Sequence, residues 1–140
     1  MEEKYYNLLL KLAKKAQNKN EVPISAVIVK DNKVIASAYN RRNKSKYILD
    51  HAEMLVIKKA SRKLKDWRLD SCELYVTLKP CSICENAIKQ SRIKNVYYLL
   101  DKPEEKKEYY KTNIVKTNIR TQQEEYSKIL KGFFAKKRDK

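Results

Sequence analysis

Apolar residues recur along the chain at two spacings, which predict where helices and strands lie. Near the N-terminus, Tyr6, Leu9, Leu10, Ala13 and Ala16 recur so that they share one face of a helix. Further along, short runs rich in valine, isoleucine and tyrosine are typical of buried strands. The pattern predicts helices over residues 3–18, 51–65, 81–91 and 121–137, and strands over 24–29, 34–39, 73–78, 95–100 and 114–119.

The order of these elements favours a layered α/β domain, because strands alternate with helices. Asp31-Asn32 is a turn signal, so the first two strands are expected to form a hairpin. Residues 40–50 are polar and basic and are interpreted as a loop. We therefore expect a three-layer α/β/α fold with a central mixed five-stranded sheet. The 140 residues suit one domain and are too few for two, so we expect a single domain over residues 1–140.

The chain is strongly basic, with 33 Lys and Arg against 17 acidic residues and a net charge of +16. Such a charge is typical of a protein that binds a polyanion, and it favours nucleic acid over a membrane. A compositional bias toward Lys, Asn, Ile and Tyr would also produce it, so charge alone leaves both explanations open. No apolar run is long enough to span a membrane, and the N-terminus does not resemble a signal peptide, so a cytoplasmic protein is expected.

Two short motifs, His51-Ala52-Glu53 and Pro80-Cys81-Ser82-Ile83-Cys84, carry candidate metal ligands. Zinc binds imidazole nitrogen and thiolate sulfur in a tetrahedron, and three protein ligands leave one position for water, as in catalytic zinc sites. His51 is the only histidine, so no other histidine can close the site. Both motifs fall at predicted helix starts, where free N–H groups and the helix dipole stabilise thiolates. The sequence therefore predicts a catalytic zinc site.

Glu53 is the candidate general acid and base. It lies two residues after His51, so on a helix its carboxylate suits a place beside the metal rather than on it. Zinc lowers the pKa of water to roughly 7, and a neighbouring carboxylate can take that proton and pass it to a leaving group. The C-x-x-C pair alone would also fit a redox pair or half of a structural zinc knuckle. Together with H-x-E it forms the signature of zinc nucleobase deaminases. Cys72 is interpreted as a small buried residue.

Longer stretches around these motifs resemble the tRNA-specific adenosine deaminases, which convert adenosine to inosine at the wobble position of tRNA anticodons. The similarity spans about residues 4–138 and is most specific over residues 74–93. That block contains Leu74-Tyr75-Val76-Thr77-Leu78, Pro80-Cys81, Cys84 and Ser91-Arg92-Ile93. The other matching stretches are Glu21-Val22-Pro23 with Ala26-Val27-Ile28-Val29, Asn40-Arg41, His51-Ala52-Glu53, Trp67-Arg68-Leu69 and Phe133-Phe134.

The resemblance implies a cytidine-deaminase-like fold, a homodimer and a hydrolytic deaminase whose partner is the anticodon arm of tRNA. Glu53 would pass a proton from water to the leaving amine as C6 of adenine is attacked, and Asn40 and Ala52 would line the nucleoside pocket. One zinc ion per subunit would be held by His51, Cys81 and Cys84. The basic tail would follow RNA phosphates through Lys136, Lys137 and Arg138.

Some positions depart from the family pattern. Ser25 stands where glycine is common, Asp50 where a small residue is usual, and Lys79 where glutamate is usual. Glu85-Asn86 replaces a small pair, and a glycine-containing segment expected after Asp101 is shortened. The zinc motifs are intact, so these changes bear on RNA specificity rather than on the metal chemistry.

Two other functions stay open. A deaminase of free cytosine, guanine or a nucleotide such as dCMP would share the zinc motif, although it would not need so basic a surface. A non-catalytic zinc-containing RNA-binding partner is the other alternative. Glu53 argues against it, because a binding module needs no proton carrier beside an open metal position.

Overall fold

The computed structural model describes residues 3–102 and 111–138, with side chains up to residue 136. The chain divides into two compact units, residues 1–104 and residues 105–140. In the described part, no helix combines the length and the apolar character needed to cross a bilayer.

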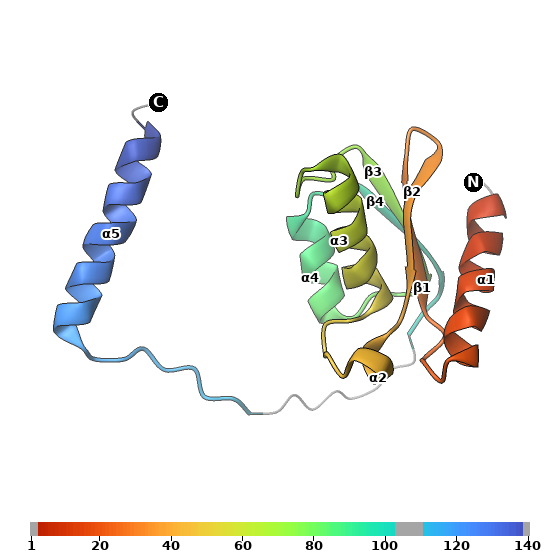
Figure 1. Ribbon diagram of the computed structural model, residues 1–140, viewed down its shortest axis with the longest axis horizontal. Helices are drawn as coiled ribbons and strands as arrows, with labels where there is room; N and C mark the ends of the chain where they lie inside the picture. The colour runs from red at the N-terminus through yellow and green to blue at the C-terminus, as the bar shows by residue number, and fades with distance from the viewer. Residues whose placement is uncertain (1–2, 103–110, 139–140) are drawn as a thin grey trace. The chain divides into compact units, whose positions relative to one another are not determined.

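The first unit is built on a mixed sheet of four strands (Figure 1). The strands are β1 (Ser25–Lys30), β2 (Lys33–Tyr39), β3 (Cys72–Leu78) and β4 (Asn95–Leu100), in the order β2-β1-β3-β4. β1 is antiparallel to β2 and to β3, and β3 is parallel to β4. The hairpin predicted between β1 and β2 is present, and Asp31 and Asn32 both have positive φ, as a tight hairpin turn requires.

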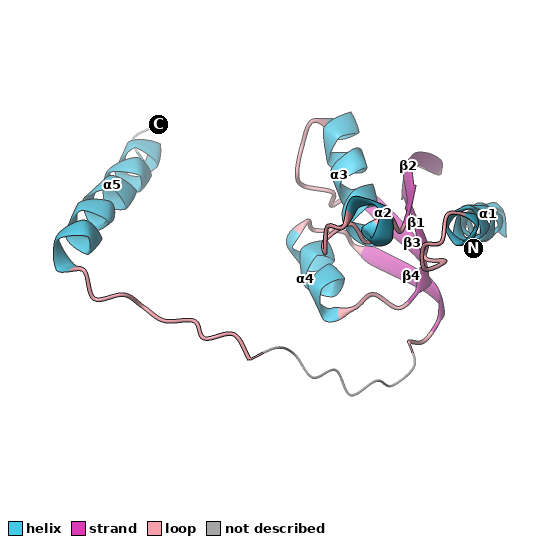
Figure 2. Cartoon of the chain, turned by 60° about the horizontal axis from the view of Figure 1, so that its bottom comes forward, coloured by secondary structure: helices cyan, strands magenta, loops and turns pink. Residues whose placement is uncertain are grey.

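Helices cover both faces of the sheet and make three layers (Figure 2). α1 (Glu3–Asn18) covers one face, and α3 (Ala52–Leu64) and α4 (Ser82–Gln90) cover the other. Because side chains alternate along a strand, Val27 and Val29 pack against α1 while Ala26 and Ile28 belong to the core below α3 and α4. The interior strand β1 is buried on both faces, which explains its continuous apolar run.

The expected fifth strand at residues 114–119 is wrong. Residues 111–119 form no regular structure, and the side chains of Ile114 and Val115 are 95% and 76% exposed. A short apolar stretch becomes a strand only when its backbone finds an edge to pair with, and none of the described strands pairs there. The helix predicted next is confirmed as α5 (Arg120–Arg138) in the second unit.

The loop expected at residues 40–50 contains one short helix, α2 (Arg42–Ser45). The helices predicted over residues 3–18, 51–65 and 81–91 correspond to α1, α3 and α4, with boundaries that differ by one residue at most. The fold is therefore an α/β/α arrangement around a mixed four-stranded sheet.

Candidate metal and catalytic site

The predicted metal ligands lie together in the first unit. One donor atom from each of His51, Cys81 and Cys84 can be chosen so that all three lie within 4.8 Å of one another. The Nδ1 atom of His51 is 3.5 Å from Sγ of Cys84 and 3.8 Å from Sγ of Cys81. The two motifs, which are 30 residues apart in the chain, thus form one cluster.

The sheet topology explains why the cluster forms. β2 and β3 are both antiparallel to β1, so they run in the same direction and end at the same edge of the sheet. The helices that follow them, α3 and α4, therefore both begin at that edge, where α/β proteins commonly bind ligands. His51 and Cys81 are the N-cap residues of these helices, and neither uses its side chain to cap its helix.

The donor set and its spacing fit a zinc ion. With the usual zinc–sulfur and zinc–nitrogen bond lengths, tetrahedral geometry places a nitrogen and a sulfur ligand about 3.6 Å apart. The two observed nitrogen–sulfur separations of 3.5 and 3.8 Å bracket that value. Burial raises the pKa of the Cys84 thiol, and the nearby Glu53 and Cys81 add to the effect. A bound cation would favour the thiolate form at this position.

Glu53 is buried beside these ligands in the first turn of α3, with 4% of its surface exposed. Burial raises the pKa of its carboxyl group, and the Cys84 thiol is a hydrogen-bonding neighbour that partly offsets this. Its Oε1 atom has no hydrogen-bond partner in the part of the chain that the structure describes. Such an atom costs about 1–3 kcal/mol, so its presence indicates a place where water or a ligand binds.

Asn40 closes the site at the end of β2. Its side chain is buried, and Oδ1 accepts a hydrogen bond from the backbone N–H of Ala52 at 2.8 Å. An Asp at position 50, before the helix predicted over residues 51–65, is a candidate N-cap in the sequence, but this assignment is wrong: His51 is the N-cap residue and Asn40 supplies the acceptor. With the helix start held by Asn40, the His51 imidazole is available to face the two sulfur atoms.

Glu21 lies in one of the stretches that match the adenosine deaminases, and its sequence position alone indicates no role. Only 6% of its surface is exposed, and its carboxylate accepts backbone N–H groups from Asn43 and Lys44. A charged residue shortly before a buried strand was the available signal. Ser25, which departs from the family pattern, is fully buried and donates its hydroxyl to the Leu9 carbonyl at 2.6 Å.

The remaining candidates lie away from the cluster or outside the description. Cys72 is buried at the start of β3, as expected, and is not one of the three clustered donors. Lys136 is exposed on α5, whereas the side chains of Lys137 and Arg138 fall outside the described residues. The shortened segment after Asp101 falls largely within residues 103–110, also outside the described residues.

Known proteins with similar sequences are deaminases. The family model for MafB19-like deaminase matches residues 1–138. The tRNA-specific adenosine deaminase of Bacillus subtilis strain 168 is 45% identical over 97 residues, which cover 69% of this chain and 60% of the relative. That of Aquifex aeolicus is 46% identical over 101 residues, with coverages of 71% and 67%. The chain thus spans less than two thirds of the length of the Bacillus subtilis relative.

Solved structures give two matches of different kinds. A structure from a study of A-to-I editing by tRNA:A34 deaminases has a TM-score of 0.65 and 43% identity, and the match covers 66% of this chain and 72% of the other. Guanine deaminase from Bacillus subtilis has a TM-score of 0.78 and 26% identity, and the match covers 94% of each chain. The first is closer in sequence, and the second extends over more of the chain.

Proposed function

This chain belongs to the MafB19-like deaminases, and from that membership we propose that it is a zinc-dependent hydrolase that converts adenosine to inosine at the wobble position of tRNA anticodons. The observation that carries the proposal is the juxtaposition of three nitrogen and sulfur metal donors with a buried carboxylate, one of whose oxygens has no hydrogen-bond partner among the described residues. The adenosine deaminases at 45% and 46% identity support adenine in tRNA as the substrate.

One zinc ion per subunit would be held by His51, Cys81 and Cys84, whose donor spacing fits it. When bound, zinc supplies Lewis acidity that makes water a stronger acid and a usable nucleophile near neutral pH. The starts of α3 and α4 add the positive ends of two helix dipoles, which favour the negative charge of the two thiolates.

Glu53 would move the protons. Hydrolytic deamination forms a carbon–oxygen bond at C6 of adenine, breaks the carbon–nitrogen bond and releases ammonia, so a proton must pass from water to the purine and the leaving amine. The raised pKa of Glu53 suits a carboxyl group that both accepts and returns a proton. Its burial excludes bulk water, and Oε1, which has no hydrogen-bond partner in the described part of the chain, gives the proton a defined destination.

Asn40 would hold the nucleoside through its amide –NH₂ group, because its carbonyl oxygen is engaged by Ala52. We expect Asn40→Asp, which keeps the acceptor, to change the free energy of unfolding by less than about 1 kcal/mol. Its kcat/KM should nevertheless fall by about 10- to 100-fold, because a donor to the substrate is lost. Asn40→Ala should lose both activity and about 1–3 kcal/mol of stability. Urea unfolding and steady-state kinetics distinguish the two variants, and equal activity of Asn40→Asp and wild type would exclude this role.

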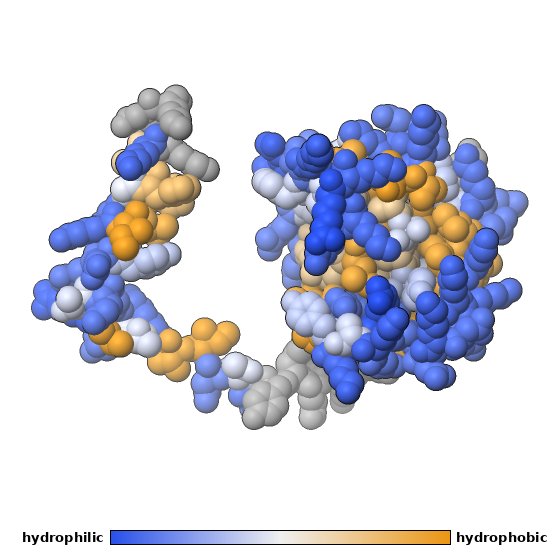
Figure 3. Space-filling model, in the orientation of Figure 1, coloured by the Kyte–Doolittle hydropathy of each residue, from blue (hydrophilic) through white to orange (hydrophobic). Residues whose placement is uncertain are grey.

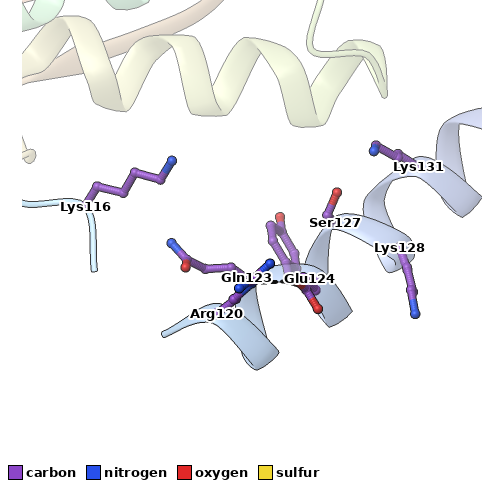
Figure 4. Close-up of a pocket in the computed structure, with 8 residues that line it drawn as sticks. Lys116, Arg120, Gln123, Glu124, Ser127, Lys128 and Lys131 are labelled. Carbon is purple, nitrogen blue, oxygen red and sulfur yellow. Dashed lines mark hydrogen bonds and ion pairs between the residues drawn. The ribbon is translucent and has the colours of Figure 1, made fainter. Parts of the chain in front are cut away.

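RNA would be bound in part by the second unit. An open hollow in the second unit, shown in close-up in Figure 4, is lined by several cations: Lys116 before α5, and Arg120, Lys128 and Lys131 on α5. The tail residues Lys136, Lys137 and Arg138 would extend this charge. Hydrophilic side chains also cover much of the face of the first unit seen in Figure 3. Because each phosphate contact releases counterions, such a surface makes binding depend on salt.

The tail contribution is measurable as a salt slope. Replacing Lys136, Lys137 and Arg138 together by glutamine should reduce the slope of log K against log salt by about 2–3, the number of phosphate contacts removed. Filter binding or fluorescence anisotropy with an anticodon hairpin gives the slope. The matched control changes Lys11, Lys14 and Lys15 to glutamine on α1, which covers the opposite face of the sheet from α3 and α4. Equal slopes for the two triple variants would remove the tail from the binding surface.

We further propose that residues 1–140 act as one deaminase domain, which the extent of the family match supports. A homodimer and a cytoplasmic location, where tRNA is processed, complete the proposal. Light scattering after gel filtration tests the dimer, and a monomer that is fully active would contradict it.

Guanine deamination is the second candidate, because the match to guanine deaminase covers 94% of this chain. Both reactions use the same metal chemistry, so the substrate decides between them. The test is to incubate the zinc-loaded protein with a tRNA that carries adenosine at the wobble position and to detect inosine by reverse transcription. Conversion at that single position supports the proposal. An unchanged tRNA together with turnover of free guanine would move the protein to the second candidate.

A further inference from the structure

The loop over residues 41–50 connects two residues of the proposed site, Asn40 and His51. Its ends are joined by a hydrogen bond from the Arg41 N–H to the Asp50 carbonyl at 3.1 Å, so the loop closes on itself. Four exposed cations lie along it. Because the loop begins and ends next to the two site residues, a substrate bound there would lie close to it. The cations are Arg41, Arg42, Lys44 and Lys46.

Hydrogen bonds within the loop shape it locally: the N–H groups of Ser45 and Lys46 donate to carbonyls of the preceding turn at 2.9 Å, and the Asp50 N–H donates to the Tyr47 carbonyl at 3.1 Å. The helix α2 has four residues, and Arg41, at its N-cap position, makes no side-chain capping bond. Lys46 ends the helix with a φ of 58°, a left-handed conformation that a residue with a side chain adopts at a cost. The four like charges also repel one another. These internal hydrogen bonds do not attach the loop to the rest of the first unit, so a contact from outside the loop is needed to hold it against the core.

Glu21 supplies that contact. Its Oε1 accepts the N–H of Asn43 at 2.9 Å and its Oε2 accepts the N–H of Lys44 at 2.8 Å. These belong to the first turn of α2, whose N–H groups have no partner within the helix. The same pair of segments is joined again by the amide of Asn43, which donates to the carbonyl of Asn20 at 3.0 Å.

Glu21 is itself well anchored. It lies between α1 and β1, its backbone N–H donates to the Ala16 carbonyl at 3.0 Å, and its side chain is buried. A buried carboxylate is costly unless it is hydrogen-bonded, and here both of its oxygen atoms are. The Glu21 side chain therefore connects the core of the first unit to the backbone of the loop.

We propose that Glu21 is a positioning residue, which holds the cationic loop 41–50 in the conformation that receives the nucleic acid beside Asn40 and His51. The inference rests on the proposed function for its kinetic consequence, whereas the hold on the loop rests on the contacts alone. Glu21 touches neither the metal donors nor the substrate, so its effect passes through the backbone of the loop.

The hold on the loop is tested without any substrate. Glu21→Gln keeps the size of the side chain but turns one acceptor into a donor that faces a backbone N–H. Losing a hydrogen bond to a charged group is enough to shift the equilibrium for local opening of the loop by about 10- to 100-fold. Trypsin should therefore cleave the variant after residues 41, 42, 44 and 46 faster by about the same factor. Mass spectrometry of the early fragments identifies these cuts. The control is Glu3→Gln, which removes the same charge at an exposed position.

The effect on the reaction is tested with an anticodon hairpin. We expect Glu21→Gln to raise KM by about tenfold while kcat at saturating RNA changes less than about threefold, because the metal ligands and Glu53 are untouched. Zinc content should equal that of wild type. Glu21→Asp keeps a carboxylate with a shorter reach and should recover part of both losses. Combined with Lys44→Gln, the Glu21 variant should show less than additive loss, because both act through the same loop.

Each outcome decides a separate point. Trypsin cleavage equal to that of Glu3→Gln would overturn the hold on the loop. Faster cleavage with unchanged KM would overturn the positioning role. A parallel fall of kcat, zinc content and thermal stability would show a merely structural role. If the wild-type protein leaves the RNA unchanged but deaminates free guanine, the proposed function fails. The proteolysis experiment still tests whether Glu21 holds the loop. In that case an unchanged KM of Glu21→Gln for guanine would overturn a positioning role toward that base.

Discussion

Replacing Glu53 by glutamine is expected to reduce kcat by about 10²- to 10⁴-fold, the usual contribution of a general acid and base. The amide has nearly the same size and cannot carry the proton between water and the leaving amine. Zinc should stay bound, because His51, Cys81 and Cys84 are unchanged. Single-turnover assays and metal analysis on one sample measure both properties.

The same variant should not lose stability. The Oε1 atom of Glu53 lacks a partner among the described residues, and burial raises the pKa of the group. Removing an uncompensated acid should therefore leave the free energy of unfolding unchanged or raise it by about 1 kcal/mol. Glu85→Gln is the matched control, because Glu85 is exposed in the first turn of α4, and this variant should keep full activity. A Glu53→Gln enzyme with wild-type kcat would contradict the mechanism.

Replacing Cys84 by serine is expected to weaken zinc binding by at least about 100-fold, because a soft thiolate is lost from a set of three protein ligands. Activity should fall with zinc content. The loss should also appear as instability, since a ligand present at about a thousand times its Kd contributes about 4 kcal/mol. For a chain of this size that corresponds to a fall in Tm of about 10 °C or more.

Cys72 makes this experiment specific. It is as buried as Cys84 but is not one of the clustered donors, so Cys72→Ser should keep zinc and lose only local stability. A chelator should lower the Tm of wild type and of Cys72→Ser by equal amounts and leave Cys84→Ser unchanged. Full zinc occupancy in Cys84→Ser would exclude this ligand set.

Much of the first unit could be predicted because its signals are local. The apolar spacing of α1 and the buried run of β1 result from faces that must be covered, so the residues themselves report them. The proximity of the candidate metal ligands could be anticipated from the two motifs at helix starts. The resemblance to tRNA-specific adenosine deaminases is likewise confirmed by relatives at 45% and 46% identity.

What the sequence could not predict depends on partners that are distant in the chain. Residues 114–119 have apolar positions but pair with none of the described strands, and such pairing depends on the folded sheet rather than on the segment itself. Asn40 caps a helix that begins 12 residues later. Glu21 binds the backbone of Asn43 and Lys44, which follow it by 22 and 23 positions in the chain. An Asp directly before a helix is the more obvious cap in a sequence, yet the structure gives that role to Asn40.

The solitary imidazole of this chain makes the metal site unusually easy to observe by spectroscopy. Since His51 is the only histidine, a nitrogen-labelled sample contains one pair of imidazole resonances and needs no assignment. Its Nδ1 faces both sulfur atoms, so metal binding there would keep the ring proton on Nε2 and select one tautomer. A single NMR spectrum of the purified protein would therefore report the fraction of molecules that carry the ion, before any enzyme assay is attempted.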